Sequence, residues 1–131
     1  MAIHVPTGKL YWGNYFGGVY SKNLDGTGET LIIPDVETGS MAVINDRIYY
    51  DEFVGSGDIR LKSAALDGSD ITTIASGIGR VIYGIAYDEE AGKIYWGDRD
   101  TDVMIRANLD GSEAEIYFQA TSDTRGIVIA N

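Results

Sequence analysis

Short segments that alternate apolar with polar residues recur along the whole chain. The segments "VYSKNL" (19–24), "IRLKSAAL" (59–66) and "VMIRANL" (103–109) have a period of two, which is typical of strands with one face on a core. Aromatic and branched runs, "KLYWGN", "RIYYDE" and "KIYWGD", precede them, and such residues favour strands. No window has the period of a long amphipathic helix. The pattern therefore predicts an all-β protein.

A tight turn follows each alternating segment. The three turns have the same sequence, Leu24-Asp25-Gly26, Leu66-Asp67-Gly68 and Leu109-Asp110-Gly111. Asp-Gly is a strong hairpin signal because glycine reaches positive φ without a steric penalty. A further strand follows each turn ("ETLII", "ITTIA", "AEIYF"), and a small or branched run ("SMAVI", "YGIAY", "RGIVIA") then begins the next unit.

The turns show that the chain is a repeat. Leu24 and Leu66 are 42 residues apart, and Leu66 and Leu109 are 43 apart. An aromatic pair precedes each turn, namely Tyr11-Trp12, Tyr49-Tyr50 and Tyr95-Trp96. Four short strands in about 42 residues are typical of a β-propeller blade. We expect blades at about 1–39, 40–82 and 83–126, with 127–131 starting a further inner strand, and we expect the aromatic pairs to pack between blades.

Composition narrows the class of protein. The chain has 131 residues, enough for a single domain, and a formal net charge of −10. Such acidity argues against nucleic-acid partners and against anionic membrane surfaces. The absence of cysteine excludes disulfides and thiolate zinc sites. The sequence predicts neither a signal peptide nor a transmembrane segment, and it leaves the compartment open.

The repeat resembles a known family. "KIYWGD" followed by "IRANLDGS", together with "HVPTGKLYWGN", "SKNLDGTGETLI" and "YGIAYDEEAGKIYW", is similar to the low-density lipoprotein receptor class B repeat, or YWTD repeat. The family's Thr-Asp is replaced by Gly13-Asn14 and Gly97-Asp98, and the middle unit has Asp51-Glu52. The resemblance implies a six-bladed β-propeller, of which this chain holds three four-stranded blades.

Three blades cannot close a ring. An open stack leaves two apolar blade faces in water, and such faces mark association. Two chains supply six blades with two-fold symmetry, the commonest symmetry of oligomers, so we expect a homodimer that closes the ring. The alternative is that the chain is half of a larger natural or engineered propeller with no function of its own.

The two ends of the chain compete for one position in such a ring. Alignment with "YGIAYDEEAGKIYW" places both Met1 and Ile127 opposite Ile85. The branched residues of "RGIVIAN" favour a buried strand. We therefore expect residues 126–131 to enter the first blade of the partner, as a clasp that removes an open sheet edge, with Met1–Ile3 frayed or displaced outward.

Candidate chemistry is sparse. The series Asp98-Arg99-Asp100-Thr101-Asp102 fails as an EF-hand loop, since its sixth and twelfth positions are Val103 and Leu109 where glycine and glutamate are required; we expect a solvated turn there. His4 is the only histidine, and we expect it to be structural or exposed. We predict no catalytic residue, no cofactor and no metal ligand.

Two functional classes remain. The first is a non-catalytic scaffold that recognises a protein or carbohydrate through one face of the disc, as the family resemblance implies. Its candidate contact residues are Tyr15, Phe16, Phe53 and Arg99. The second is a propeller lyase or lactonase with a metal in the central channel.

Overall fold

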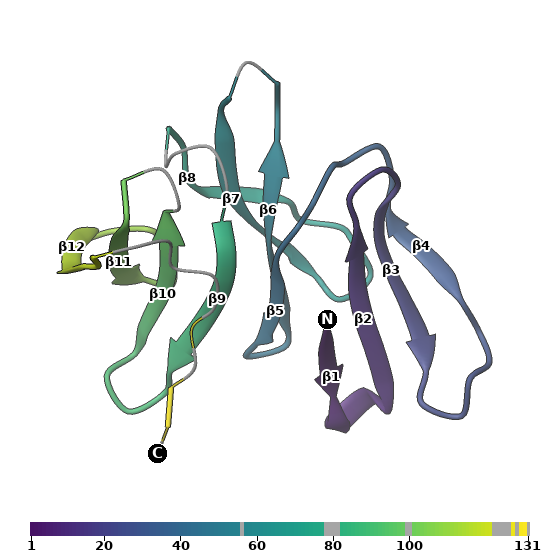
Figure 1. The fold of residues 1–131 in the computed structure, drawn as a ribbon. Coiled ribbons are helices and arrows are strands. Elements are labelled where there is room, and N and C mark those ends of the chain that lie inside the picture. Colours follow the sequence, from purple (N-terminus) through teal and green to yellow (C-terminus); the bar gives the residue numbers. More distant parts are fainter. Residues whose placement is uncertain (56, 78–81, 99–100, 122–126, 128, 131) are drawn as a thin grey trace.

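The computed structural model describes residues 1–55, 57–77, 82–98, 101–121, 127 and 129–130. In these residues the strands form three four-stranded antiparallel sheets (Figure 1). The prediction of an all-β chain with three four-stranded units is confirmed. The described part contains one three-residue 3-10 turn, η1 (Val5–Thr7), and no described helix has the length and apolar character needed to cross a membrane.

Each sheet is built from consecutive strands. The first contains β1 (Ala2–His4), β2 (Lys9–Asn14), β3 (Gly18–Asn23) and β4 (Thr30–Ile33). The second contains β5 (Met41–Ile44), β6 (Arg47–Phe53), β7 (Ile59–Ala65) and β8 (Thr72–Ala75). The third contains β9 (Ile82–Asp88), β10 (Lys93–Asp98), β11 (Val103–Asn108) and β12 (Glu115–Gln119). Ile82, the last residue of the expected second unit, is thus the first residue of the third sheet.

The sheets repeat in detail. The third and fourth strands of each sheet pair with one irregularity, which falls after Val19, Leu61 and Met104 respectively. These residues are equivalent, because each lies five positions before the leucine of its Leu-Asp-Gly turn. A β-bulge bends and twists a strand locally, so all three sheets twist at the same place.

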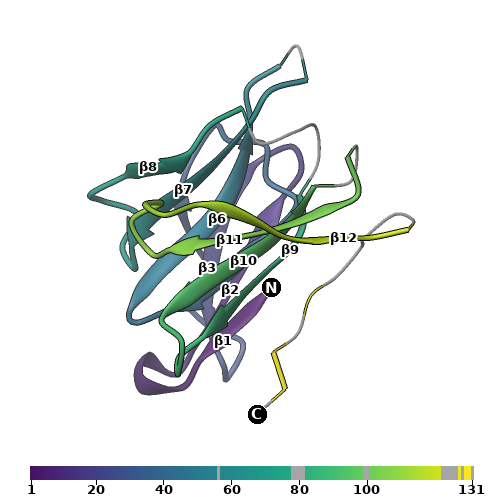
Figure 2. The same ribbon diagram turned by 90° about the vertical axis from the view of Figure 1, so that its left-hand side faces the viewer.

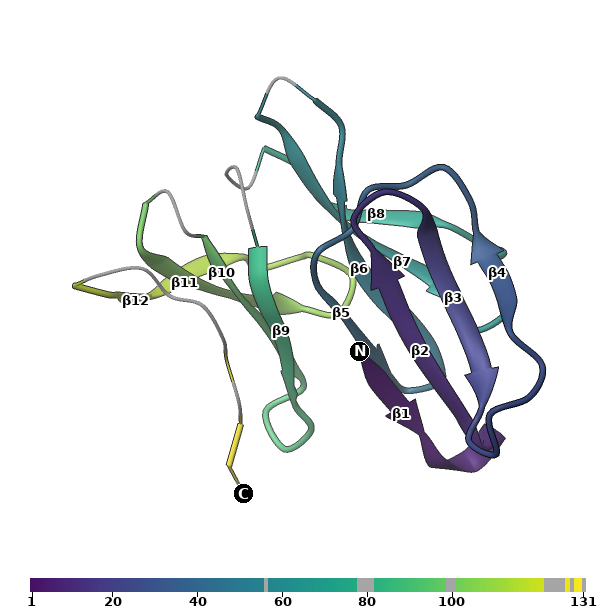
Figure 3. The same cartoon turned by 45° about the vertical axis from the view of Figure 1, so that its right-hand side comes forward.

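The sheets stack like the blades of a fan. Their first strands, β1, β5 and β9, follow one another along one side of the molecule (Figure 3), and β5 contacts both β1 and β9. The outer strands β4, β8 and β12 lie away from this side (Figure 1). Figure 2 faces the third sheet, which has no further sheet in front of it.

Two hydrophobic cores hold the stack together. The first core lies between the first and second sheets and contains Tyr11, Val19, Ile33, Val36, Met41, Ile48, Tyr50 and Ala64. The second core lies between the second and third sheets and contains Ile44, Tyr49, Ile59, Leu61, Ile82, Ile94, Trp96 and Ala107. The expected packing of aromatic pairs between sheets accounts for much of both cores.

The expected displacement of Met1–Ile3 is wrong for this chain. Ala2–His4 form β1, which pairs with β2 in its own sheet through Ala2↔Tyr11, Ile3↔Leu10 and His4↔Lys9. The hairpin is local, so its closure costs little entropy. The expected clasp comprises residues 126–131, of which residues 126, 128 and 131 lie outside the described residues.

Candidate functional site

Each sheet has two faces with distinct residues. We call the face toward the following sheet the trailing face, and the face toward the preceding sheet the leading face. The trailing faces of the first and second sheets carry equivalent residues at three positions: Tyr11, Val19 and Ile33, and then Tyr49, Leu61 and Ala75. Each of these residues belongs to a core or packs against one.

The leading faces of the second and third sheets are equally well covered. Ile48, Tyr50 and Ala64 face the first sheet, and their equivalents Ile94, Trp96 and Ala107 face the second. Trp96 is only 1% exposed. At each of the two internal junctions, the trailing face contributes a tyrosine and two aliphatic residues. The leading face contributes one aromatic residue and two aliphatic residues.

The first sheet presents a leading face on which no other sheet of the described chain packs. Strand register places Leu10 beside Ile3, and Trp12 beside Tyr20. Trp12 stacks on Tyr20 with 5.6 Å between ring centroids, and Ile3 is 62% exposed. Leu10 and Trp12 are the equivalents of Ile48 and Tyr50, which are fully buried. Trp12 is thus half-buried, unlike Trp96, because no sheet precedes it.

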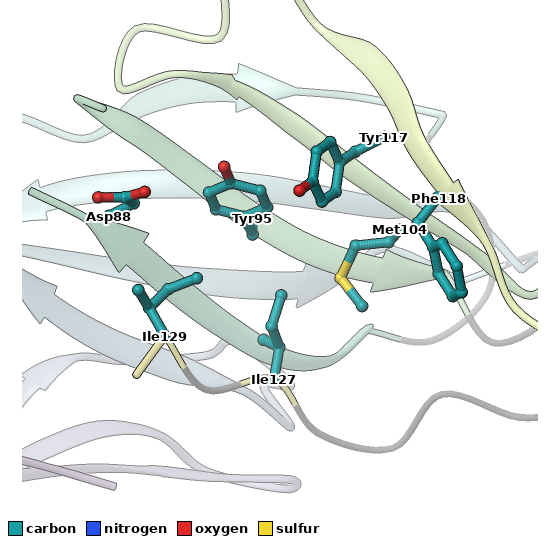
Figure 4. Close-up of a pocket in the computed structure, with 7 residues that line it drawn as sticks. All are labelled: Asp88, Tyr95, Met104, Tyr117, Phe118, Ile127 and Ile129. Atoms are coloured by element: carbon teal, nitrogen blue, oxygen red, sulfur yellow. The ribbon is translucent and has the colours of Figure 1, made fainter. Parts of the chain in front are cut away.

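The third sheet presents the matching trailing face. Tyr95, Met104 and Phe118 occupy the positions of Tyr11, Val19 and Ile33, and register pairs Met104 with Phe118 as it pairs Val19 with Ile33. Phe118 is 57% exposed. These side chains line an open groove of about 310 Å³, which Asp88 and Tyr117 also border (Figure 4).

The C-terminal end lies over this groove. Ile127 and Ile129 both line it and point toward the side chains of the third sheet (Figure 4). In Figure 3 the end of the chain lies beyond β9, on the side away from β5. The sequence pattern alone does not predict that these two residues point into this groove.

The Leu-Asp-Gly turns dock on the preceding sheet. Leu66 packs against the first core and Leu109 against the second. A Cβ added to Gly68 would lie 2.0 Å from the carbonyl oxygen of Ile32, and one added to Gly111 would lie 2.0 Å from that of Ile74. The first turn has no preceding sheet: Leu24 is 54% exposed, and a Cβ on Gly26 would meet nothing within 4 Å.

The aspartates of these turns are structural. Asp25 Oδ1 accepts hydrogen bonds from the backbone nitrogen of Thr27 at 2.9 Å and from its hydroxyl at 2.6 Å. Asp67 and Asp110 make the same pair of bonds with Ser69 and Ser112. These hydrogen bonds lower the pKa of all three carboxyl groups, since they favour the ionised form.

Some of the predicted contact residues lie on one rim of the stack. Tyr15 and Phe16, in the loop between β2 and β3, form an edge-to-face pair with 4.7 Å between ring centroids. Phe16 is 84% exposed and borders a shallow pocket with Gly17, Asp35, Val36 and Glu37. Glu37 in turn bridges to Phe53, whose backbone nitrogen donates to the Glu37 carbonyl at 3.0 Å. Arg99 lies outside the described residues.

Two buried carboxylates accept hydrogen bonds from the loops that connect strands. Asp51 Oδ1 accepts hydrogen bonds from Thr38 Oγ1 at 2.9 Å and from the backbone nitrogens of Gly39 and Ser40 at 2.8 Å. Burial raises the pKa of Asp51. Asp98 is only 5% exposed and accepts a bond from Thr101 Oγ1 at 2.6 Å, so the expectation of a solvated turn is wrong for Asp98.

His4 joins two sheets. Its Nε2 lies 2.8 Å from Oδ1 of Asp46 in the second sheet, and its Nδ1 lies 2.8 Å from Oγ1 of Thr7. The side chain is nearly buried against Tyr11. These contacts tie β1 to the turn between β5 and β6. Within the part of the chain that the structure describes, no group of three histidine, cysteine, aspartate or glutamate side chains is placed to hold a metal ion.

Comparison with solved structures places this geometry among propeller folds. No protein-family model matches the chain. A chain in the crystal structure of a nidogen/laminin complex is similar with a TM-score of 0.85 and 12% identity, over 95% of this chain and 49% of that one. A putative TolB from Agrobacterium tumefaciens is similar with a TM-score of 0.69 and 16% identity, over 89% of this chain and 47% of that one.

A third solved structure, a protein of unknown function from Bacteroides thetaiotaomicron VPI-5482, is similar with a TM-score of 0.68 and 19% identity, over 94% of this chain and 32% of that one. This chain therefore spans about half or less of the length of these three solved chains. At these identities the likeness shows the fold alone, and that fold is of the β-propeller type.

Proposed function

We propose that this chain is half of a six-bladed propeller of the YWTD type, and that a second copy supplies the other half. The observation that carries the proposal is the pair of sheet faces on which no neighbouring sheet packs, which we call the uncovered faces. The trailing face of the third sheet has the residue classes that the internal junctions have on that side. The leading face of the first sheet matches at two of three positions, Leu10 and Trp12, and has Lys22 where the internal junctions have Ala64 and Ala107. A second copy, related by a two-fold axis along the channel, would bring each uncovered face onto its counterpart.

The aromatic residues support this pairing. At the internal junctions Tyr11 faces the side of the second sheet that carries Tyr50, and Tyr49 faces the side of the third that carries Trp96. The corresponding residues at the closing junction are Tyr95 of one chain and Trp12 of the other. Covering these faces removes apolar surface from water, which is the dominant favourable term in association.

The first Leu-Asp-Gly turn supports the same arrangement. Gly68 and Gly111 lie against carbonyl oxygens of the preceding outer strand, whereas Gly26 lies against nothing. The residue of the third sheet equivalent to Ile32 and Ile74 is Tyr117, eight positions after the turn leucine in each case. Ring closure would seat Gly26 against the Tyr117 carbonyl of the partner and would cover the exposed Leu24.

A matched pair of variants tests ring closure. Trp12→Lys puts a charge on the leading face, and Tyr15→Lys puts the same charge on an exposed aromatic of the rim. We expect sedimentation equilibrium to show a much weaker dimer for Trp12→Lys and an unchanged dimer for Tyr15→Lys, with circular dichroism confirming that both variants fold. Equal effects of the two variants, or none for Trp12→Lys, would argue against this junction.

The alternative is that further residues of a longer chain complete the ring. The solved chains that span about twice this length are compatible with it. The two uncovered faces have the same role in either case, since each needs a neighbouring blade. The Trp12→Lys comparison tests whether this chain pairs with itself, since such pairing makes its mass depend on concentration.

We further propose that the assembled ring is a non-catalytic binding module, and that a protein docks on the rim around Phe16. An exposed aromatic pair beside Asp35 and Glu37 suits a partner with lysine or arginine side chains, through cation–π and ionic contacts. The solved relative in a nidogen/laminin complex is compatible with protein recognition. A neutral carbohydrate is the other candidate, since sugars also stack on exposed aromatic rings.

Charge-matched variants test the rim. A fluorescein-labelled octalysine peptide and a panel of neutral oligosaccharides serve as probes in titrations. Glu37→Gln and Glu89→Gln remove the same charge from the rim and from the exposed turn after β9. Weaker peptide binding for Phe16→Ala and Glu37→Gln, but not for Glu89→Gln, supports a cationic partner. Sugar binding lost only in Phe16→Ala indicates a carbohydrate, and equal losses for both glutamate variants indicate general charge attraction and overturn the proposal.

The enzymatic alternative, a lyase or lactonase with a channel metal, has no observation in its favour among the described residues. A test remains simple. We expect elemental analysis of the purified chain to find no stoichiometric transition metal, and we expect chelation to leave its thermal midpoint unchanged. A ligand that binds only the native state raises that midpoint, so metal-dependent stabilisation would favour the enzyme.

A further inference from the structure

Two residues of the C-terminal end, Ile127 and Ile129, lie on the third sheet where the inner strand of a following sheet would pack. We call these two residues the C-terminal segment. Ile127 and Ile129 are two positions apart and both enter the groove bordered by Tyr95, Met104 and Phe118 (Figure 4). The segment therefore covers the trailing face of the third sheet, where the next sheet would pack.

Sequence equivalence identifies which strand the segment imitates. Alignment of "RGIVIAN" with "YGIAY" places Ile127 opposite Ile85 and Ile129 opposite Tyr87. Ile85 and Tyr87 lie in β9, the inner strand of the third sheet, and both pack against the second core. Ile127 and Ile129 thus present to the third sheet the positions that an inner strand presents to the sheet before it.

The strand β1 of a second copy requires the same place. Met1 and Ile3 are the equivalents of Ile85 and Tyr87 in the first sheet, and Ile3 lies on the uncovered leading face beside Leu10. When the ring closes, β1 arrives with the rest of its sheet. The C-terminal segment and the β1 of the partner cannot both occupy the groove.

The two competitors are held with different strength. β1 has three residue pairs with β2, and His4 ties it to Asp46 of the second sheet at 2.8 Å. Among the described residues, Ile127 and Ile129 are not part of a strand, and the attachment that the structure describes for them is the packing of their side chains in the groove. Displacing β1 would break a ladder and an intersheet contact, whereas displacing the segment would break apolar contacts that the incoming sheet replaces.

We propose that the C-terminal segment is an autoinhibitory cover, which shields the groove in the isolated chain and yields to the β1 of the partner when the ring closes. The proposal rests on the proposed ring closure by a second copy. Its effect on dimer affinity is opposite to that of the strand clasp expected from the sequence, because a clasp strengthens the dimer and a cover weakens it. A protein whose competent state is fractionally populated binds with an affinity reduced by that fraction.

The size of the effect follows from the occupancy of the cover. A segment that covers the groove about nine-tenths of the time lowers the apparent affinity about tenfold at each junction. A two-fold ring has two such junctions, so removing both covers should tighten the dimer about a hundredfold.

The test compares two charge-matched double variants of the full chain by sedimentation equilibrium. Ile127→Asp with Ile129→Asp places two charges on the side chains that enter the groove. Thr121→Asp with Ala130→Asp places two charges on exposed residues of the same end. We expect the first variant to have a dimer dissociation constant about a hundredfold lower than the wild type, and the second to match the wild type. Ile127→Ser with Ile129→Ser should tighten the dimer without added charge.

Each other outcome has a definite meaning. A weaker dimer for the isoleucine variants would show that the segment is a shared strand and would overturn the cover. Unchanged affinity, or equal changes for both double variants, would also overturn it while leaving ring closure intact. If neither the wild type nor any variant associates at any concentration tested, ring closure by a second copy fails, and the cover fails with it.

Discussion

Alanine substitution of the three turn glycines tests how each sheet docks on its neighbour. Gly26, Gly68 and Gly111 have φ values of 90°, 86° and 86°, so alanine meets the same backbone strain at each, about 1–2 kcal/mol. The surroundings differ: the new Cβ would lie 2.0 Å from the carbonyl oxygen of Ile32 or Ile74 in the last two cases and would meet nothing in the first. Relief of such crowding costs roughly 1–3 kcal/mol more.

Urea denaturation at a concentration where the chain is monomeric measures these differences. We expect Gly26→Ala to lower the free energy of unfolding by about 1–2 kcal/mol and the other two substitutions to lower it by roughly 2–5 kcal/mol in total. Equal losses at all three positions would refute the docking of the turns on the preceding sheet.

The same series at higher concentration probes the closing junction. Gly92 is a matched control, since it also has positive φ and open space around its missing Cβ, but it lies in the turn between β9 and β10. We expect Gly26→Ala to weaken the dimer and Gly92→Ala to leave it unchanged. The same dimer affinity for both variants would contradict the seating of Gly26 on the partner.

Four further predictions concern particular side chains and the net charge. Fluorescence emission should shift to the blue as concentration rises, because closure buries Trp12 while Trp96 is already buried; a spectrum independent of concentration counts against closure. Added salt should tighten the dimer, since screening reduces repulsion between chains of formal charge −10; analytical ultracentrifugation in a salt series checks this. Burial raises the pKa of Tyr50 to about 12, so stability present below pH 10 should fall as the pH rises toward 12, and Tyr50→Phe should remove that part of the loss in pH-dependent urea melts. Asp51→Ala should cost about 1–3 kcal/mol, because it removes the acceptor of the buried Thr38 hydroxyl and of the backbone nitrogens of Gly39 and Ser40, whereas Asp51→Asn keeps one acceptor oxygen and should cost less.

The repeat made the sheets predictable. Leu24, Leu66 and Leu109 fix the period, and the hairpin signal of each following Asp-Gly depends on local backbone geometry alone. The strands before and after each turn have side-chain patterns that a half-buried sheet requires. The equivalence of units then assigns every strand a position in its sheet, which the structure confirms as three sheets of four.

The sequence did not show that the leading face of the first sheet and the trailing face of the third lack a neighbouring sheet. Trp12 and Trp96 have the same motif, but only the structure shows that one is half-buried and the other fully buried. The reason is position in the stack, which a local motif does not encode. The orientation of Ile129 into the groove likewise depends on packing beside Tyr95, which lies 34 residues earlier in the sequence.

Two local expectations were wrong for physical reasons that the sequence conceals. Asp98 lies in a run of alternating aspartates that suggests solvent, yet its strand position buries it. β1 has weak strand propensity, yet the local turn at Gly8 and the contact of His4 with Asp46 hold it in place. Tertiary contacts override propensity in both cases.

The solution mass of the wild-type chain across a concentration series tests the central claim most directly. Light scattering coupled to size exclusion should give twice the chain mass of 14.2 kDa at micromolar concentration and above, with no larger species, because two half-rings close completely. A compact, folded particle of 14.2 kDa at these concentrations, or a ladder of ever larger oligomers, would contradict the closed two-chain ring.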